Sequence, residues 1–490
     1  MRALSLGLIL GCLPALAIAQ ESPVPPQFTE VIAKIQELRA ADTLLTLSVA
    51  AVHDGSILWE AGFGAAPSTV YRLASVSKSL TAIGVMTLVQ QHRLELDAPV
   101  SRYLGTKAVR VLRGREQDLT VRRLLNMTGG IPHVVNFYWS DGPPPLEEKA
   151  MLQRFGFSAF APGETFHYSN MSFGVAQSVV SAVAGMPFDV WMRQEVFAPL
   201  GMTRTRLRPD ADTSAEAAAY QGTRNPVRLP VGGLEPDGGA GFRSSAHDLA
   251  LLAAALTDPK HDRLLSRQSV DTMWDFRRLG FYALGWWRGL GQSSETVAIA
   301  DGAAAGSSAT IEVHPSRGIA VIALANRGSG VTNSLTGMLA RAAELMAGQE
   351  PTPPGVRPEL PDALRDEDFA LDAPWRGEWC GAITQDERKT PVALRIGQDS
   401  VISFSIGQST GLAQPGSQIT AGTLRISFAP FDAPAPVLPG AYQLALFLRT
   451  DGATLYGYAS ASSTDARPHF VHTFPVSFTR ARPGLTCPLH

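Results

Sequence analysis

The chain has 490 residues, is 45% hydrophobic and carries 42 basic against 44 acidic side chains, for a formal net charge of −2. This length and near-neutral balance suit two or three globular domains and exclude a largely disordered chain. Nucleic-acid or anionic-membrane surfaces show as clustered Lys and Arg, so we expect neither as a partner. Lysine is scarce, with six lysines beside 36 arginines, so a lysine within a motif is informative.

Residues 1–19 indicate a cleavable export signal. Arg2 precedes an apolar run, and a small-x-small pattern ends at Ala19. A lipoprotein signal at Cys12 is the alternative, although the apolar stretch before that cysteine is short. No later apolar run reaches about 18 residues, so no transmembrane span is expected. We therefore expect a periplasmic or secreted bacterial protein.

The first elements after the signal are a helix and a hairpin. Apolar residues recur at helical spacing in 28–43, which predicts an amphipathic helix. Next, Asp54-Gly55 stands between two β-prone segments, and this dipeptide suits a tight hairpin turn. Two antiparallel strands are expected around it.

The stretch "YRLASVSKSL" (71–80) holds a serine and a lysine three positions apart, Ser75 and Lys78. On a helix that begins near Ser75, Lys78 lies one turn further on the same face. A lysine whose pKa is lowered by burial or by nearby positive charge can take the proton of a serine hydroxyl. The alternative is a surface Ser–Lys pair on an ordinary helix.

A second site element follows in "FAPGETFHYSN", where Tyr168 and Asn170 form the only Y-x-N of the chain. The motif comes after a Pro-Gly turn and before another helical stretch. Two structural alternatives stay open: Tyr168 as a buried aromatic with a satisfied hydroxyl, and Asn170 as a helix N-cap.

The segment 309–328 predicts a strand, a Pro-Ser-Arg-Gly turn and a second strand, and 332–348 predicts a helix. This order mirrors the helix and hairpin at the start. Residues 20–350 are therefore expected to form one domain, with an antiparallel sheet flanked by helices and an all-helical region in between.

Residues 351–372 are rich in Pro and acidic side chains and have no apolar period, as in an interdomain linker. Residues 373–490 contain short β-prone segments separated by turns, which predicts an all-β accessory domain. A lipocalin-like barrel would remove exposed edges, and a sandwich is the alternative. Such a domain could shape the site mouth, mediate assembly or bind a cell-wall or sugar partner.

Two cysteines, Cys380 and Cys487, remain once the signal is removed. An oxidising compartment favours a disulfide between them. The alternative is two unrelated buried thiols.

Several stretches, in order, resemble a family that contains class C β-lactamases, penicillin-binding DD-peptidases and related serine esterases and D-aminopeptidases. They are "LASVSKSLTAIGVMTLVQQHRLELDAPVSRYL", "TVRRLLNMTGGIP", "FAPGETFHYSN", "FAPLGMTRT" and "GGAGFRSSAHDLALLAAAL". The resemblance covers about residues 30 to 345 and implies a serine β-lactamase-like α/β (α+β) fold. It implies Ser75 as the acylated nucleophile, Lys78 and Tyr168 as its general acid/base partners, and Asn170 as a substrate-positioning group. Which partner takes the first proton stays open.

The family's third element is Lys-Thr-Gly or His-x-Gly on a strand that faces the site, and the matching residues here are Ala300, Asp301 and Gly302. Gly302 still allows close approach to substrate, and the Ala303 backbone N–H is expected to join that of Ser75 in an oxyanion hole. The missing cation removes a charge-assisted hydrogen bond of about 1.5–3 kcal/mol to a substrate carboxylate. Asp301 would add repulsion.

These features predict an exported serine hydrolase that forms an acyl-enzyme at Ser75 and acts on a small ester, amide or peptide, with carboxylate-free substrates ranked above penicillins. A second hypothesis is a β-lactamase or D,D-carboxypeptidase that uses Arg327 as a replacement cation. A third is a catalytically inactive binding or sensor protein on the same fold. We expect no metal or cofactor, since His469 and His472 lack neighbouring Cys or carboxylate ligands. The sequence leaves the oligomeric state open.

Overall fold

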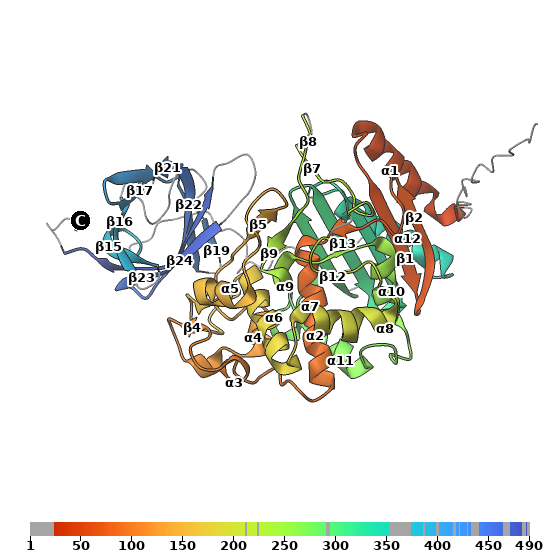
Figure 1. The fold of residues 1–490 in the computed structure, drawn as a ribbon, viewed down its shortest axis with the longest axis horizontal. Helices are drawn as coiled ribbons and strands as arrows, with labels where there is room; N and C mark the ends of the chain where they lie inside the picture. The colour runs from red at the N-terminus through yellow and green to blue at the C-terminus, as the bar shows by residue number, and fades with distance from the viewer. Residues whose placement is uncertain are drawn as a thin grey trace, which may run out of the picture.

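The computed structural model describes residues 24–210, 213–222, 225–290, 295–328, 330–351, 374–385, 388–397, 401–414, 418–420, 422–428, 430–432, 441–463, 471–482 and Cys487. The expected export signal, and all but one residue of the predicted linker, lie outside these ranges. Figure 1 shows a larger part built of helices and a sheet, and a smaller part formed by the C-terminal strands.

The larger part is organised around a six-stranded sheet in which each neighbouring pair is antiparallel, with strand order β11-β12-β13-β14-β1-β2. The strands are β1 (Leu47–His53), β2 (Ser56–Phe63), β11 (Trp287–Leu290), β12 (Thr296–Ala304), β13 (Ser307–His314) and β14 (Ile319–Ala325). Early strand β1 pairs with late strand β14, so the predicted union of the two ends of this region is confirmed.

The hairpin predicted at Asp54-Gly55 is present between β1 and β2. Asp54 has φ 43° and Gly55 has φ 80°, the left-handed backbone that a two-residue hairpin turn of this type requires. A side chain at Gly55 would be strained in this conformation, which explains glycine at the second turn position.

Helices cover both faces of the sheet. On one face, Val49 and Ala51 pack with α1 (Thr29–Ala41) and α12 (Asn333–Met346) in one apolar cluster. On the other face, Ala50 and Val52 join the main core together with α10 (Ala246–Thr257). Both faces of β1 are thus buried, which explains its continuous apolar sequence.

The region between the two halves of the sheet is mainly helical, as expected. Besides α10, its helices are α2 (Ser77–Gln90), α3 (Ser101–Leu104), α4 (Val121–Leu125), α5 (Glu148–Phe155), α6 (Asn170–Ala184), α7 (Phe188–Met192), α8 (Ala198–Leu200), α9 (Asp237–Ala240) and α11 (Arg267–Met273). Short helical turns of other types are η1 (Pro26–Phe28), η2 (Ala74–Val76), η3 (Glu116–Asp118), η4 (Arg193–Phe197), η5 (Phe276–Arg278) and η6 (Pro315–Arg317). Among the described residues, no single helix is long and apolar enough to cross a membrane.

In the described part of the chain, four small two-stranded sheets lie between these helices in the sequence. They are β3 (Tyr71–Arg72) with β10 (Arg243–Ser244), β4 (Arg110–Val111) with β6 (Phe157–Ser158), β5 (Asn136–Trp139) with β9 (Gly232–Glu235), and β7 (Tyr220–Gln221) with β8 (Val227–Arg228). Strand β3 ends at Arg72, shortly before Ser75, and its pairing with β10 helps to place the turn that follows.

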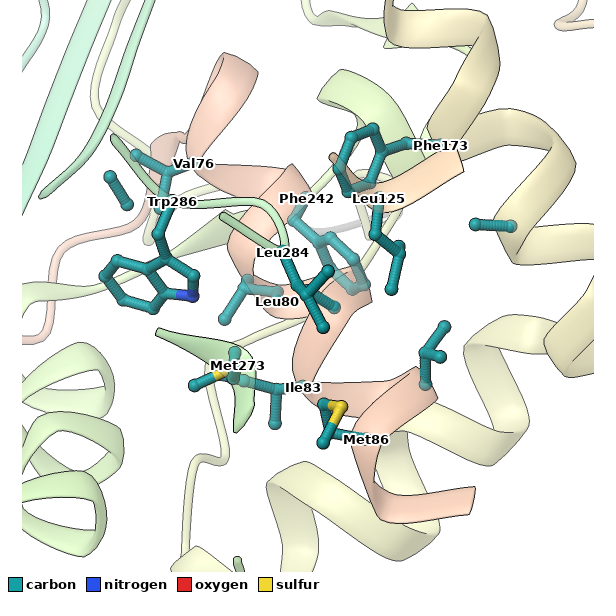
Figure 2. Packing of buried hydrophobic residues seen from close by; sticks show 14 of the residues in the cluster. Val76, Leu80, Ile83, Met86, Leu125, Phe173, Phe242, Met273, Leu284 and Trp286 are labelled. Atoms are coloured by element: carbon teal, nitrogen blue, oxygen red, sulfur yellow. The ribbon is translucent and has the colours of Figure 1, made fainter. Parts of the chain in front are cut away.

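Helix α2 is the central helix of the main core. Its apolar side chains Leu80, Ile83 and Met86 are fully buried, and Figure 2 shows them among residues from several other elements. Phe173 of α6 and Trp286, which precedes β11, belong to the same cluster. Because this helix is enclosed on all sides, the residues at its start are held in a rigid setting.

The C-terminal residues form one antiparallel sheet with the order β18-β17-β16-β15-β24-β23-β22-β20-β19, in which β21 also pairs with β22. The strands are β15 (Gly377–Gln385), β16 (Arg388–Ile396), β17 (Ile402–Ile406), β18 (Ser409–Leu412), β19 (Gln418–Thr420), β20 (Thr423–Ser427), β21 (Phe431–Asp432), β22 (Ala441–Thr450), β23 (Thr454–Ser463) and β24 (Val471–Arg480). First strand β15 pairs with last strand β24, and a bridge between Ala413 and Phe428 brings the two ends of the sheet together. The domain is therefore barrel-like, as predicted, and not a sandwich.

Cys380 and Cys487 form the predicted disulfide, which closes a loop across 107 positions. A cross-link across so long a loop restricts the unfolded chain strongly. We expect the double variant Cys380→Ser/Cys487→Ser to lose about 2–5 kcal/mol of unfolding free energy in this domain. Chemical denaturation followed by the fluorescence of buried Trp379 would measure the loss, and an unchanged midpoint would contradict the expectation.

Candidate active site

Ser75 is the middle residue of the short turn η2, and helix α2 begins directly after this turn. The preceding residue, Ala74, has φ 46°, a left-handed backbone that costs an L-residue about 1–2 kcal/mol. Strain of this kind concentrates at functional sites, where the surrounding structure enforces it. Ser75 itself is half-buried, so the residue lies within an ordered setting without being fully enclosed.

Lys78 is buried, with 1% of its surface exposed, and reaches back to Ser75 as the sequence predicts. Its Nζ lies 3.0 Å from Ser75 Oγ, 2.5 Å from Asn170 Oδ1 and 2.9 Å from the carbonyl oxygen of Gly239. These three acceptors match the three hydrogens of an ammonium group. A neutral amine would donate to Asn170 and Gly239 and direct its lone pair at Ser75.

Tyr168 and Asn170 stand at the start of α6. The side chain of Ser169, between them, accepts a hydrogen bond from the Ser172 backbone N–H and so caps the helix. Asn170 is thus not the cap, and its side chain is available to Lys78. The Tyr168 hydroxyl donates to Ser75 Oγ at 2.7 Å, so it is not a merely structural aromatic.

The surroundings shift the pKa of both groups that contact Ser75. Burial lowers the pKa of Lys78 well below its usual range, although the negative charge of Asp301 acts in the opposite direction. Burial raises the pKa of Tyr168, and the hydrogen bond to Ser75 opposes this shift. The arrangement therefore favours a neutral amine and a neutral phenol on opposite sides of one hydroxyl.

Strand β12 brings the third predicted element to the same place. A Cβ on Gly302 would lie 2.2 Å from the carbonyl oxygen of Leu73 and 2.7 Å from the backbone nitrogen of Ser75, so only glycine fits. Strand β11 pairs with residues Thr296 to Ile299 of β12, and Gly302, beyond that pairing and directly before Ala303, lies against the turn η2. Ala300 is buried and supplies no cation.

Asp301 is half-buried, and its carboxylate lies near enough for its charge to raise the pKa of both Lys78 and Tyr168. Arg327, the candidate replacement cation, is engaged elsewhere. Its guanidinium forms a bidentate pair with Asp42, which lowers the pKa of that carboxyl, and lies 5.0 Å from the ring centre of Tyr220. The hypothesis that Arg327 substitutes for the missing lysine therefore loses its support.

Several groups around Ser75 were not predicted from the sequence. Trp287 lies nearly parallel to Tyr168, with ring centres 6.1 Å apart, and Tyr282 packs on Trp287 at 4.7 Å. The ring of His133 lies 5.6 Å from that of Tyr168, and its Nδ1 accepts the Asn170 backbone N–H at 3.3 Å. Of the histidines and aromatic residues near the site, only His167 could have been suspected from the sequence, because it directly precedes Tyr168.

Within the part of the chain that the structure describes, no group of three or more His, Cys, Asp or Glu side chains is arranged to hold a metal ion. His469 lies outside that part.

Comparison with known proteins gives a consistent picture. The family model described as Beta-lactamase matches residues 31–344. Esterase EstB of Burkholderia gladioli is 30% identical over an alignment of 275 positions, which covers 46% of this chain and 68% of EstB. Penicillin-binding protein 4* of Bacillus subtilis (strain 168) is 29% identical over an alignment of 175 positions, which covers 33% of this chain and 37% of that protein.

A solved structure extends the likeness of the fold to the C-terminal part. The octameric penicillin-binding protein homologue from Pyrococcus abyssi aligns with a TM-score of 0.53 at 20% sequence identity, over 90% of this chain and 99% of that chain. At this identity the likeness concerns the fold alone.

The fold, the serine-centred network and these relatives define a serine hydrolase. Because the family model covers well over half of its residues, the chain belongs to the Beta-lactamase family.

Proposed function

We propose that this protein forms an acyl-enzyme at Ser75 and hydrolyses esters or amides that carry no carboxylate next to the scissile carbonyl. The observation that carries the proposal is the convergence of three groups, with Ser75 Oγ 3.0 Å from Lys78 Nζ and 2.7 Å from Tyr168 Oη. Both distances allow direct proton transfer.

In the proposed first step, neutral Lys78 takes the proton of Ser75 while Oγ attacks the substrate carbonyl carbon. Two features support Lys78 rather than Tyr168 as this base. Its pKa is lowered by burial, and its two remaining N–H groups have acceptors in Asn170 and Gly239. Tyr168, whose pKa is raised, already donates its proton to Ser75 Oγ and is therefore in the acid form.

The oxyanion of the tetrahedral intermediate is proposed to accept hydrogen bonds from the backbone N–H groups of Ser75 and Ala303. The close approach of Gly302 to the Ser75 backbone supports this pairing. The intermediate then collapses, and the alkoxide or amine leaving group takes up a proton from the Lys78–Tyr168 pair. Water, activated by the same pair, hydrolyses the acyl bond and restores Ser75.

The substrate class follows from charge at the third element. Ala300 offers no cation for a substrate carboxylate, and the negative charge of Asp301 lies near enough to act on Lys78. Two like unit charges 4 Å apart repel by about 4 kcal/mol at an effective dielectric of about 20. Neutral or cationic substrates are therefore favoured over penicillins and over peptides that end in D-alanine.

The test of the proposal is the acylation class of Ser75. The full chain is incubated with a fluorophosphonate or with a fluorescent penicillin, and intact mass and peptide mapping locate any adduct. Labelling of Ser75 by the fluorophosphonate but not by the penicillin is the expected result. The reverse pattern would support a penicillin-recognising enzyme, and no adduct from either reagent would favour the binding protein.

Asp301→Asn is expected to relax the discrimination against negative charge. We expect the ratio of kcat/KM for p-nitrophenyl butyrate to that for p-nitrophenyl hemisuccinate, which carries a carboxylate, to fall by at least about tenfold. Asp301→Glu keeps the charge and serves as one control, and Asp271→Asn, on exposed α11, serves as the other. An unchanged ratio in Asp301→Asn would show that Asp301 does not select substrate charge.

Export to the periplasm or beyond belongs to the same proposal. The disulfide between Cys380 and Cys487 supports it, because such bonds persist in oxidising compartments. The mass of the protein recovered from a bacterial host's periplasm should lack about the first 19 residues. Recovery of the uncleaved chain from the cytosol would contradict this part.

A further inference from the structure

The C-terminal sheet contacts the segment that carries Tyr168. Strands β22 and β23 lie against the loop between β6 and α6, in the part of Figure 1 where the C-terminal sheet meets the helical region. We call the contacting residues the interdomain patch: Phe160, Glu164 and His167 from the loop, and Phe447, Arg449, Tyr456 and Tyr458 from the sheet.

The outer part of the patch is polar and partly exposed. Arg449 pairs with Glu164 at 2.8 Å, and the Tyr456 hydroxyl donates to the same carboxylate at 3.3 Å. Arg113 pairs with Asp451 at 3.2 Å, and its guanidinium lies 3.9 Å from the ring centre of Tyr456. These contacts hold the two parts together at a distance from Ser75 and its partners.

The inner part of the patch is formed around Tyr458, which is fully buried. Its ring stacks on Phe447, with centres 4.6 Å apart, and meets Phe160 edge-on. Its hydroxyl lies 2.7 Å from His167 Nε2. Burial raises the pKa of Tyr458, and the nearby His133 backbone acts in the opposite direction.

Both histidines are neutral, because burial lowers the pKa of His167 to about 4 and that of His133 to about 3. A neutral imidazole has one donor and one acceptor nitrogen, so the Tyr458 hydroxyl and His167 Nε2 share one hydrogen bond whose direction follows the tautomer of His167. In either direction this bond fixes the His167 ring against the C-terminal sheet.

The histidine bound by Tyr458 is the immediate neighbour of a proposed acid/base group. His167 directly precedes Tyr168, whose hydroxyl donates to Ser75 Oγ. A second histidine, His133, lies beside Tyr168, with ring centres 5.6 Å apart, and its Nδ1 accepts the Asn170 backbone N–H at 3.3 Å. A hydroxyl of the C-terminal sheet thus contacts the segment that places Tyr168 beside Ser75.

We propose that Tyr458 is a positioning residue, through which the C-terminal domain holds Tyr168 in its active geometry. The inference rests on the proposed function and deepens it, because it makes the β-domain a structural part of the active site. A small displacement of an acid/base group lowers the rate of the chemical step without removing substrate contacts.

The test compares Tyr458→Phe with Tyr456→Phe in the full chain. Each variant loses one hydroxyl from the same strand and the same interface, but the Tyr458 hydroxyl contacts His167 whereas the Tyr456 hydroxyl contacts Glu164. We expect Tyr458→Phe to lower kcat for p-nitrophenyl butyrate by roughly tenfold, with KM within about twofold of the parent value. Tyr456→Phe should keep the parent kcat.

The rate is expressed per serine labelled by the fluorophosphonate, so unfolded protein does not contribute. A lower melting temperature with an unchanged kcat per labelled serine would overturn the proposal, as would equal losses of kcat in the two variants. Amide hydrogen exchange of residues 163–176 should rise in Tyr458→Phe and not in Tyr456→Phe, and unchanged exchange would also overturn it. If the parent itself is not labelled, the proposed function fails, and the exchange measurement still decides whether Tyr458 orders this segment.

Discussion

Replacing Ser75 by alanine is expected to abolish labelling by the fluorophosphonate and to lower kcat/KM for p-nitrophenyl butyrate by at least about ten-thousandfold. The reason is that covalent catalysis has no substitute within the site, since Lys78 and Tyr168 both converge on this one hydroxyl. The remaining activity would come from substrate binding and the backbone donors alone. Intact mass and steady-state kinetics measure the two effects.

Stability separates a nucleophile from a structural serine. Ser75 is half-buried, and Lys78 keeps two other acceptors without it, so the free energy of unfolding should change by no more than about 1 kcal/mol. Ser68→Ala, at an exposed position in the same segment, is the matched control and should keep full activity. A large loss of stability in Ser75→Ala, or persistent labelling elsewhere in the chain, would refute the assignment.

The elements of the fold that could be predicted were those with strong local signals. The Asp54-Gly55 hairpin follows from turn chemistry, and the helix over 28–43 follows from apolar periodicity; both are present, as β1–β2 and α1. The pairing of β1 with β14 was inferred only because the two ends of the region had mirrored patterns. The curl of the C-terminal sheet depends on the contact of Ala413 with Phe428, which no local pattern specifies.

The candidate site was predictable where two residues share one helical turn or one short motif. Ser75 and Lys78 are placed by helix geometry, and Tyr168 and Asn170 by a short motif that Ser169 caps. The positions of the Asp301 and Arg327 side chains relative to the site were not predictable. Whether Asp301 faces the site depends on how β12 meets the turn η2, and Arg327 turned out to pair with Asp42, 285 positions away.

Contacts between the two parts of the chain left no trace in the sequence. Tyr458 and His167 are 291 positions apart, and neither belongs to a recognisable motif. Nothing in the alternation of a β-strand distinguishes a tyrosine that packs on another domain from one that faces its own core. Such residues are found only from coordinates, which explains why the role of the C-terminal domain stayed open at first.

Lys78→Met is expected to lower the rate of Ser75 acylation by about 100-fold to 10,000-fold, the usual contribution of a positioned general base. Methionine has a similar length and suits the buried stem, but it cannot accept a proton. Asn170 and the carbonyl of Gly239 lose their donor, so some stability is lost as well. Lys34→Met, on the partly exposed side of α1, is the matched control and should label at the parent rate.

The pH dependence tests the same base with a defined sign. Only the neutral amine accepts the proton of Ser75, so kcat/KM should rise with pH through the pKa of Lys78, which burial places well below the usual range. Asp301 raises that pKa, so Asp301→Asn should move the rising limb to lower pH, and Lys78→Met should remove it. The chain contains only six lysines, so ¹³Cε-lysine NMR resolves few signals. The signal that is missing in Lys78→Met belongs to Lys78. If this signal titrates with the same pKa as the surface lysines, Lys78 is ruled out as the base, because an amine that stays charged at the working pH cannot take the serine proton.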